Sequence, residues 1–234
     1  MNILQELEDF INDFNNSNDE DFNIDTVRVK FSKQHKLEAL KEVGKWEKLK
    51  KNSPLIPKLK KRLLFDEVTS AYRLENHNIY YYNSNIDAPK YRKAILVIFG
   101  LKQYHKDPPP KELISKLMQI MKDVSSVDIC LDLPYKPNFE TLKHNFILTP
   151  FISNKGVVTG TEYINNTGTL MLDTIVFYDK AFKNDLKHTL WRIEATISIP
   201  NIRALMLPLY EFKQITDLAK SGKETAYCIK GVIK

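Results

Sequence analysis

The sequence predicts an α+β fold, in which a largely antiparallel or mixed β-sheet carries helices on one face and leaves an open polar face that carries the site. Residues 190–199, LWRIEATISI, alternate between apolar and polar side chains, which is typical of a half-buried strand. Residues 126–134, SVDICLDLP, show the same alternation. Residues 113–121 instead place apolar side chains at helical spacing, which predicts a helix that covers the apolar face of the sheet.

The N-terminal region differs in composition from the rest of the chain. Residues 1–22 hold seven acidic residues and no lysine or arginine. Apolar residues at helical spacing predict an amphipathic helix over residues 3–14, and the polar run NNSNDEDFN at 15–23 predicts a linker. We therefore expect an acidic N-terminal helix and linker at residues 1–23, followed by one domain at residues 24–234.

The other elements follow from alternation, helical spacing and turn residues. We expect helices over residues 36–51, 113–121 and 209–220, and no clear element over residues 140–153. The run NNTG at 165–168 predicts the turn of a hairpin, because Asn and Gly accept positive φ angles. The predicted strands are residues 24–32, 73–83, 91–100, 126–134, 159–164, 169–182 and 190–199.

The overall composition sets limits on the class of protein. With 43% hydrophobic residues among 234, the chain can bury a real core. Its two distant cysteines indicate neither a disulfide framework nor a cysteine zinc site. We see no apolar run of membrane-spanning length and no N-terminal leader, so we expect a cytoplasmic protein with no membrane partner.

A lysine-rich region spans residues 36–62, where ten Lys or Arg stand against three Glu. The whole chain carries a formal charge of +6, so this region accounts for the basic excess. Such a density of cations can contact several DNA phosphates, although a solvated helix face would show the same pattern. The predicted DNA-binding residues are Lys45, Lys48, Lys50, Lys51, Lys58, Lys60, Lys61 and Arg62.

The polar sides of two predicted strands carry three carboxylates. Asp128 and Asp132 lie on one strand, and Arg192 and Glu194 lie on the other. If both strands belong to one sheet, these side chains converge on its open face. Carboxylate oxygens suit hard ions, so Asp128, Asp132 and Glu194 are predicted ligands of Mg²⁺ or Mn²⁺. The alternative is simple ion pairing on a solvated sheet face.

A tyrosine and a lysine share one side of a third predicted strand, TIVFYDK. Tyr178 and Lys180 point to the same face of this strand, and Ile175 and Phe177 point to the other. Positive charge nearby favours the phenolate form of a tyrosine, which is a nucleophile. The alternative is a tyrosine that only packs. The same choice applies to the run IYYYN at residues 79–83, which could stack on unpaired bases, although tyrosine is also favoured in strands.

These motifs resemble those of a known family. Residues 160–184, GTEYINNTGTLMLDTIVFYDKAFKN, followed by HTLWRIEATISI at 188–199, resemble the core signature of the Rep_trans family of rolling-circle replication initiators. The segment SVDICLDLP is similar to an upstream aspartate-bearing strand of that family, and IDTVRVKFS at 24–32 is similar to its first strand. The arginine that usually precedes the aspartate strand is absent, because serines occupy residues 125 and 126.

The resemblance implies a metal-dependent DNA nicking and joining reaction on a plasmid or phage origin. Tyr178 matches the nicking tyrosine, Arg192 and Glu194 match an Arg-x-Glu pair, and Asp128 and Asp132 match the aspartates. Lys180 completes the predicted catalytic group of Tyr178, Arg192 and Lys180. The implied partners are single-stranded or hairpin origin DNA, a host helicase and a second copy of the chain.

Two other functions remain open from the sequence. A replication or transcription regulator on the same scaffold would bind DNA through the lysine-rich region and would not need Tyr178. A nuclease that uses a metal-bound water would need the carboxylates and would form no covalent adduct with DNA.

Overall fold

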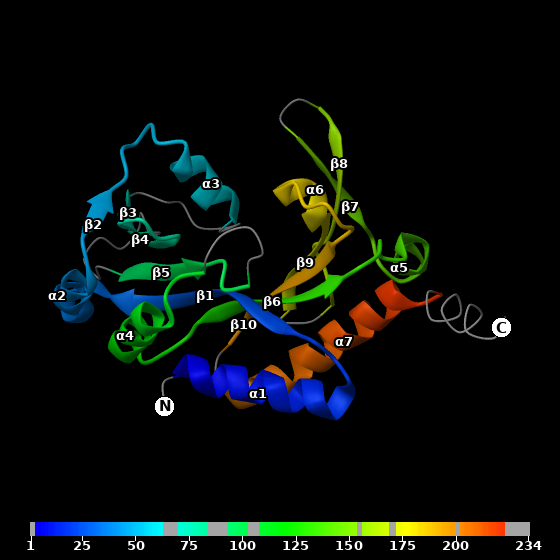
Figure 1. The fold of residues 1–234 in the computed structure, drawn as a ribbon, viewed down its shortest axis with the longest axis horizontal. Coiled ribbons are helices and arrows are strands. Elements are labelled where there is room, and N and C mark those ends of the chain that lie inside the picture. Colours follow the sequence, from blue (N-terminus) through cyan, green and yellow to red (C-terminus); the bar gives the residue numbers. More distant parts are fainter. Residues whose placement is uncertain are drawn as a thin grey trace. The chain divides into compact units, whose positions relative to one another are not determined.

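A computed structural model describes residues 3–62, 70–83, 93–102, 108–153, 156–168, 172–199 and 202–222. These residues form ten strands and seven α-helices, which confirms the α+β class (Figure 1). The chain divides into two compact units, residues 1–13 with 24–127 and residues 14–23 with 128–234. The boundary at residue 23 between an appendage and a single domain stays a prediction.

The first unit contains an antiparallel array of five strands in the order β2-β3-β4-β5-β1. Strand β5 is buried on both faces, because every residue from Ala94 to Phe99 is shielded from solvent. The elements of this unit, with the helix α1 that begins in it, are α1 (Ile3–Asn18), β1 (Asn23–Ser32), α2 (Lys33–Val43), β2 (Trp46–Lys48), α3 (Leu55–Arg62), β3 (Ser70–Leu74), β4 (Ile79–Asn83), β5 (Lys93–Phe99) and α4 (Lys111–Met121).

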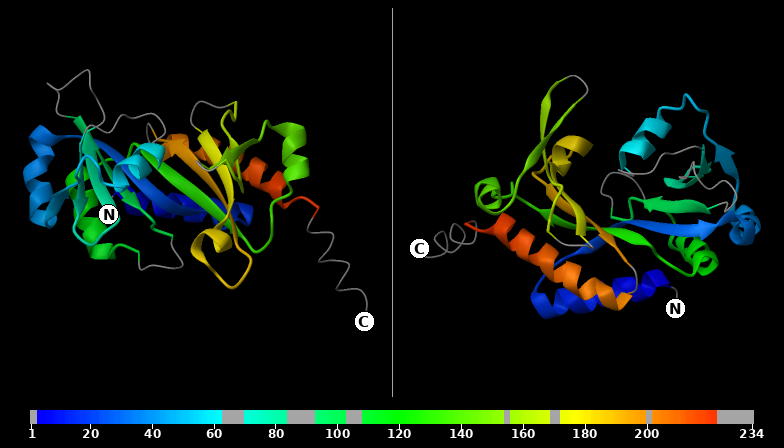
Figure 2. Two further views of the ribbon diagram at one scale, coloured as in Figure 1. Left: turned by 90° about the horizontal axis from the view of Figure 1, so that it is seen from above. Right: turned by 180° about the vertical axis from the view of Figure 1, so that it is seen from behind.

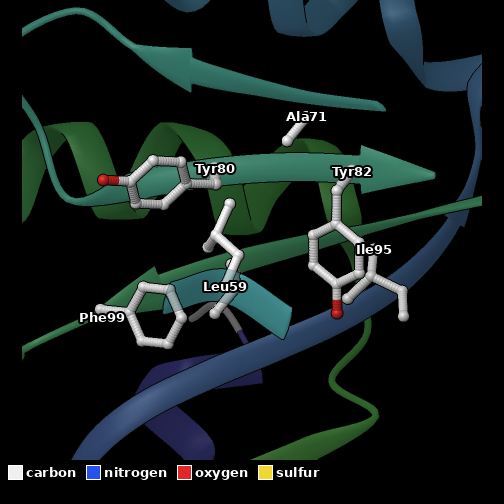
Figure 3. Packing of buried hydrophobic residues seen from close by; sticks show 7 residues of the cluster. Leu59, Ala71, Tyr80, Tyr82, Ile95 and Phe99 are labelled. Atoms are coloured by element: carbon white, nitrogen blue, oxygen red, sulfur yellow. The ribbon is translucent and has the colours of Figure 1, made fainter. Parts of the chain in front are cut away.

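Helix α3 covers one face of this array with apolar side chains (Figure 3). Leu59 is buried, and Leu55 and Ile56 pack against the same cluster. The cluster consists of Leu59, Ala71, Tyr80, Tyr82, Ile95, Val97 and Phe99. Strand periodicity puts Tyr81 on the opposite face, where its ring stacks on Tyr72 with centroids 4.6 Å apart. All three tyrosines of the run IYYYN therefore pack in the core, as the structural alternative expects.

Two predictions in this unit are wrong. The helix expected over residues 36–51 ends at Val43, and residues 46–48 form strand β2 beside β3. A β-carbon at Gly44 would lie 3.0 Å from Cδ1 of the buried Leu74, so a larger residue there requires the Leu74 side chain to shift. The single strand expected over residues 73–83 is a hairpin of β3 and β4, and Asn76 takes a φ of 61° in its turn.

The second unit arranges its strands in the order β6-β10-β9-β8-β7, and the pairings from β10 to β7 are antiparallel. The hairpin of β7 and β8 extends away from α5 and α7 (Figures 1 and 2). The elements are β6 (Ser126–Leu133), α5 (Phe139–Asn145), β7 (Thr149–Ile152), β8 (Val158–Ile164), β9 (Leu172–Asp179), α6 (Lys180–Asn184), β10 (Trp191–Ser198), the 3-10 helix η2 (Ile202–Leu205) and α7 (Met206–Lys220).

Helices cover the apolar side of β9 and β10, as the alternation of both strands predicts. The ring of Phe139 on α5 lies edge-on to Phe177 and Trp191, with centroids 5.9 Å and 5.7 Å away. Helix α7 contacts both strands and buries Leu209, Phe212, Ile215 and Ala219. The opposite, polar side of the same strands carries the candidate site.

Residues 14–23 belong to this second unit. The ring of Phe22 packs on Phe212 of α7, with centroids 4.9 Å apart. The buried carboxylate of Glu20 lies 2.9 Å from Lys220 and 3.4 Å from Lys213. The interpretation of residues 15–23 as a simple polar linker is therefore wrong, because α1 continues to Asn18 and Phe22 and Glu20 are buried against α7.

Candidate active site

Tyr178 and Glu194 lie together on the polar face of strands β9 and β10. The ladder pairs Tyr178 with Arg192 and Val176 with Glu194, so all four side chains share one face. The Tyr178 hydroxyl donates a hydrogen bond to Oε2 of Glu194 over 3.0 Å. Both residues are half-buried. The predicted nucleophile therefore has a carboxylate within reach of its proton.

Arg192 and Asp132 form a buried, two-pronged ion pair between β10 and β6. Nε and Nη2 of Arg192 each donate to one carboxylate oxygen of Asp132 over 2.7 Å. Arg192 is only 1% exposed, although it stands on the polar side of the alternation. The two parallel hydrogen bonds match the planar guanidinium to the carboxylate, and they hold β10 against β6.

Asp128 is buried on β6, four residues before Asp132, and its partner on β10 is Thr196, four residues after Arg192. The Thr196 hydroxyl donates to Oδ1 of Asp128 over 2.8 Å. Asp128 is 4% exposed. The charged groups on the β6 side of this face are thus enclosed, whereas Tyr178 and Glu194 keep partial contact with solvent.

Lys180 lies near Asp132, but it belongs to a helix and not to the strand on which it was predicted. Strand β9 ends at Asp179, whose side chain accepts a hydrogen bond from the Phe182 amide and caps helix α6. Lys180 is therefore the first residue of a helix, and the expectation that it shares a strand face with Tyr178 is wrong. Its ammonium group is buried and lies 4.0 Å from Oδ2 of Asp132.

Lys183 is the residue that the sequence reasoning missed. Its Nζ lies over the Tyr178 ring, 4.3 Å from the centroid, in a cation–π contact. The available signal was Asp179, because an aspartate after an alternating strand can cap a helix. In a helix capped by Asp179, Lys183 lies about one turn after the cap, which brings it near the end of β9.

A second tyrosine, Tyr163 on β8, lies on the same face of the sheet as Glu194, with β9 between their two strands. Tyr163 pairs with Val176, which in turn pairs with Glu194, so the three side chains share one face. Burial, and secondarily the negative charge of Glu194, raises the pKa of Tyr163 above its usual value of 10.0. Tyr163 is thus held in its neutral form.

The three predicted metal ligands are not brought together as one ligand group. In the described part of the chain, no three His, Cys, Asp or Glu side chains are grouped as metal ligands. Asp132 is engaged by Arg192, Asp128 by Thr196, and Glu194 by Tyr178. The residues do not fit an ion in this arrangement, and binding of Mg²⁺ or Mn²⁺ stays a prediction.

The lysine-rich region belongs to the first unit and is only partly helical. Lys48 on β2 and Lys50 and Lys51 after it are exposed. Lys45 lies 3.3 Å from Glu47 and 3.8 Å from Glu75. The side chains of Lys58, Lys60, Lys61 and Arg62 lie outside the described residues, although their backbone belongs to α3.

Comparisons with known proteins give a likeness to solved structures. No family model matches the chain, and no curated protein matches it. Membership of the Rep_trans family therefore stays a prediction. Among solved structures, the chain is similar to a rolling circle replication initiator protein from Geobacillus stearothermophilus, with 14% identity and a TM-score of 0.49. That likeness covers 86% of this chain and 79% of the other.

Among the helices of the described segments, none has the length and apolar character needed to cross a membrane.

Proposed function

We propose that this protein nicks and rejoins origin DNA through Tyr178 and so initiates rolling-circle replication of a plasmid or phage. The observation that carries the proposal is the hydrogen bond from the Tyr178 hydroxyl to Glu194, 3.0 Å long, on a half-buried part of the polar face. A hydroxyl that already donates to a carboxylate is placed to lose its proton as it attacks. The resemblance of the surrounding motifs to replication initiators supports the same chemistry.

The proposed step is a transesterification. The Tyr178 oxygen attacks the phosphorus of one phosphodiester, and the bond from phosphorus to the 3′ oxygen breaks. The phenolic proton passes to Glu194, and the leaving 3′ oxygen takes a proton from water. Tyr178 then holds the 5′ phosphate, and the free 3′ hydroxyl can prime synthesis. Reversal by an incoming 3′ hydroxyl rejoins the strand.

Arg192 and Asp132 act in this proposal by positioning. Their buried pair holds β10 against β6, and Glu194 is two residues from Arg192 on the same face of β10. Lys180 adds a buried positive charge next to Asp132. A phosphate contact by Arg192 stays a prediction, because two of its nitrogens are bonded to Asp132 in this structure.

A divalent cation supports the attack in the family that the sequence resembles, where it would neutralise phosphate charge. The described carboxylates do not form a site for it, so no step above depends on one. Metal dependence is tested directly by repeating the reaction with Mg²⁺, with Mn²⁺ and with a chelator. A rate that is unchanged by the chelator would remove the metal from the proposal.

The test of the function is the covalent adduct. The protein is incubated with a random library of 3′-labelled single-stranded and hairpin oligonucleotides and Mn²⁺, then denatured. We expect label to stay on the protein, and mass spectrometry to place it on the peptide that contains Tyr178. Tyr178→Phe should lose the adduct, because only the hydroxyl is removed. Tyr163→Phe is the matched control and should keep it.

The other outcomes separate the rival functions. DNA binding without an adduct in the unaltered protein would support the non-catalytic regulator. Cleavage without an adduct would support a nuclease that uses water. An adduct that persists in Tyr178→Phe and disappears in Tyr163→Phe would make Tyr163 the nucleophile.

A further inference from the structure

Helix α6 is a short element that is held firmly on one side and open on the other. The amides of Lys180 and Ala181 both donate to the Leu190 carbonyl, over 2.8 Å and 3.0 Å, and both residues are buried. The Asp179 side chain caps the first turn. These contacts leave Phe182 and Lys183 on the exposed side, directly after the strand that carries Tyr178.

Phe182 is an exposed aromatic side chain on α6, four residues after the candidate nucleophile in the sequence. It is 84% exposed. The fold does not need its ring, because the apolar side of β9 and β10 is already covered by α5 and α7. A single exposed apolar residue is common on proteins, so exposure alone does not indicate a ligand. The second observation is that the next residue, Lys183, contacts the Tyr178 ring.

That contact is the ammonium group of Lys183, which lies 4.3 Å from the centre of the Tyr178 ring. Lys183 is itself largely exposed. Any phosphate that Tyr178 attacks must approach the phenolic oxygen, and Lys183 presents a positive charge at the same ring. A lysine is a compact point charge with three donors, which suits a phosphate oxygen.

We propose that Phe182 and Lys183 form a strand-binding surface on α6 for single-stranded DNA at the cleavage point. This inference rests on the proposed function. Lys183 contacts the phosphate that Tyr178 attacks, and Phe182 stacks on an unpaired base of an adjoining nucleotide. Stacking on an aromatic ring requires an unstacked base, so the surface selects single-stranded DNA over duplex. A basic and aromatic pair of this kind fits nucleic acid rather than an apolar protein partner.

The phosphate half of the proposal is tested with Lys183→Gln, Lys183→Arg and the control Lys187→Gln, another exposed lysine of the same unit. Adduct formation is measured on an oligonucleotide recovered from the library, with and without a methyl group in place of one charged oxygen at the scissile phosphate. We expect Lys183→Gln to slow the normal substrate by about 10- to 150-fold, as for a lost charge-assisted hydrogen bond. Lys183→Arg should restore much of the rate.

The uncharged phosphate makes this test specific. On that substrate the ratio of rates between the unaltered protein and Lys183→Gln should fall toward one, because there is no phosphate charge left to bind. A merely structural role for Lys183 would slow both substrates equally, and that result would overturn the proposal. Lys187→Gln should change neither rate.

The base-stacking half is tested with Phe182→Ala, Phe182→Trp and the control Ile147→Ala, whose side chain is 87% exposed between α5 and β7. A fluorescent 2-aminopurine is placed at each nucleotide on either side of the scissile phosphate. We expect Phe182→Ala to weaken single-strand binding about 5- to 150-fold and to remove quenching at one position. Phe182→Trp should keep both properties. Unchanged quenching in Phe182→Ala would overturn the proposal.

The results separate this inference from the function on which it rests. If the unaltered protein forms no adduct, the nicking function fails, and this proposal fails with it. If the unaltered protein forms an adduct that all Lys183 and Phe182 variants form equally well, only the strand-binding surface fails.

Discussion

The two units of the protein use tyrosine in opposite ways. In the first unit, Tyr80 and Tyr82 pack in an apolar cluster under α3, and Tyr81 stacks on Tyr72. In the second unit, Tyr178 is half-buried, donates to Glu194 and has Lys183 over its ring. An apolar setting keeps a phenol neutral, whereas an adjacent carboxylate can take its proton. The neighbours of a tyrosine, more than its place on a strand, therefore distinguish a packing tyrosine from a candidate nucleophile.

The largest expected effect sharpens this comparison at Glu194. Glu194→Gln keeps the shape of the side chain but removes the carboxylate that would accept the Tyr178 proton. We expect the rate of adduct formation to fall about 10²- to 10⁴-fold, as for loss of a general base. Glu162→Gln on β8 is the control, because Glu162 pairs with Phe177 on the other face. A normal rate in Glu194→Gln would assign the proton to another acceptor.

The next effect concerns stability, and it tests whether the charges around Tyr178 hold the second unit together. Asp132→Asn leaves the buried guanidinium of Arg192 without a full counter-charge, with Lys180 also nearby. We expect the free energy of unfolding to fall by about 3–5 kcal/mol in urea denaturation. The double variant Asp132→Leu with Arg192→Met should recover part of this loss, because it buries no charge. A loss below about 1 kcal/mol would show that the pair is solvated.

Much of the second unit could be predicted from the sequence, because its strands alternate strictly. Period two alone puts Arg192 and Glu194 on one face of β10. The register that places Tyr178 of β9 on the same face is seen only in the structure. The partners of those side chains could not be predicted. The pairing of Arg192 with Asp132 joins residues that are far apart in the sequence, and one sequence gives no distance between them.

The failures in the first unit have a local cause. The lysines and glutamates around residue 44 favour a helix, but Gly44 and the pairing of Trp46–Lys48 with β3 override that preference. The strand expected over residues 169–182 likewise runs too far, because the Asp179 side chain caps helix α6. In the first case the pairing of β2 with β3, and in the second the Asp179 cap, decides where the element ends.

A smaller expected effect is the dependence of stability on pH that Tyr81, a packed tyrosine of the first unit, produces. Burial, and secondarily Tyr72, raises the pKa of Tyr81 from 10.0 to about 12. In the unfolded chain Tyr81 ionises near its usual pKa, so stability is fully present below about pH 10 and is lost as the pH rises toward the folded pKa. Tyr81→Phe should therefore show a shallower loss of stability between pH 10 and 12. The measurement is urea denaturation across that range.

Tyr210→Phe is the control for that experiment, because Tyr210 is 45% exposed on α7. Its stability should fall with pH as steeply as that of the unaltered protein. An equal slope in Tyr81→Phe would show that Tyr81 ionises as easily in the folded protein as in the unfolded one.

The smallest effect tests whether the lysine-rich region of the first unit contributes to DNA binding. Each phosphate contact releases counterions, so the logarithm of affinity falls with the logarithm of salt concentration by about 0.9 per contact on duplex DNA. Replacing the exposed Lys48, Lys50 and Lys51 with Gln should make this slope shallower by up to about 2.7, with sequence preference nearly unchanged. Lys45→Gln is the matched control, and its effect should be smaller because Glu47 and Glu75 already neutralise that charge. If the triple variant keeps the original slope, these lysines only solvate the surface, and DNA affinity must come from the strand-binding surface and its surroundings in the second unit.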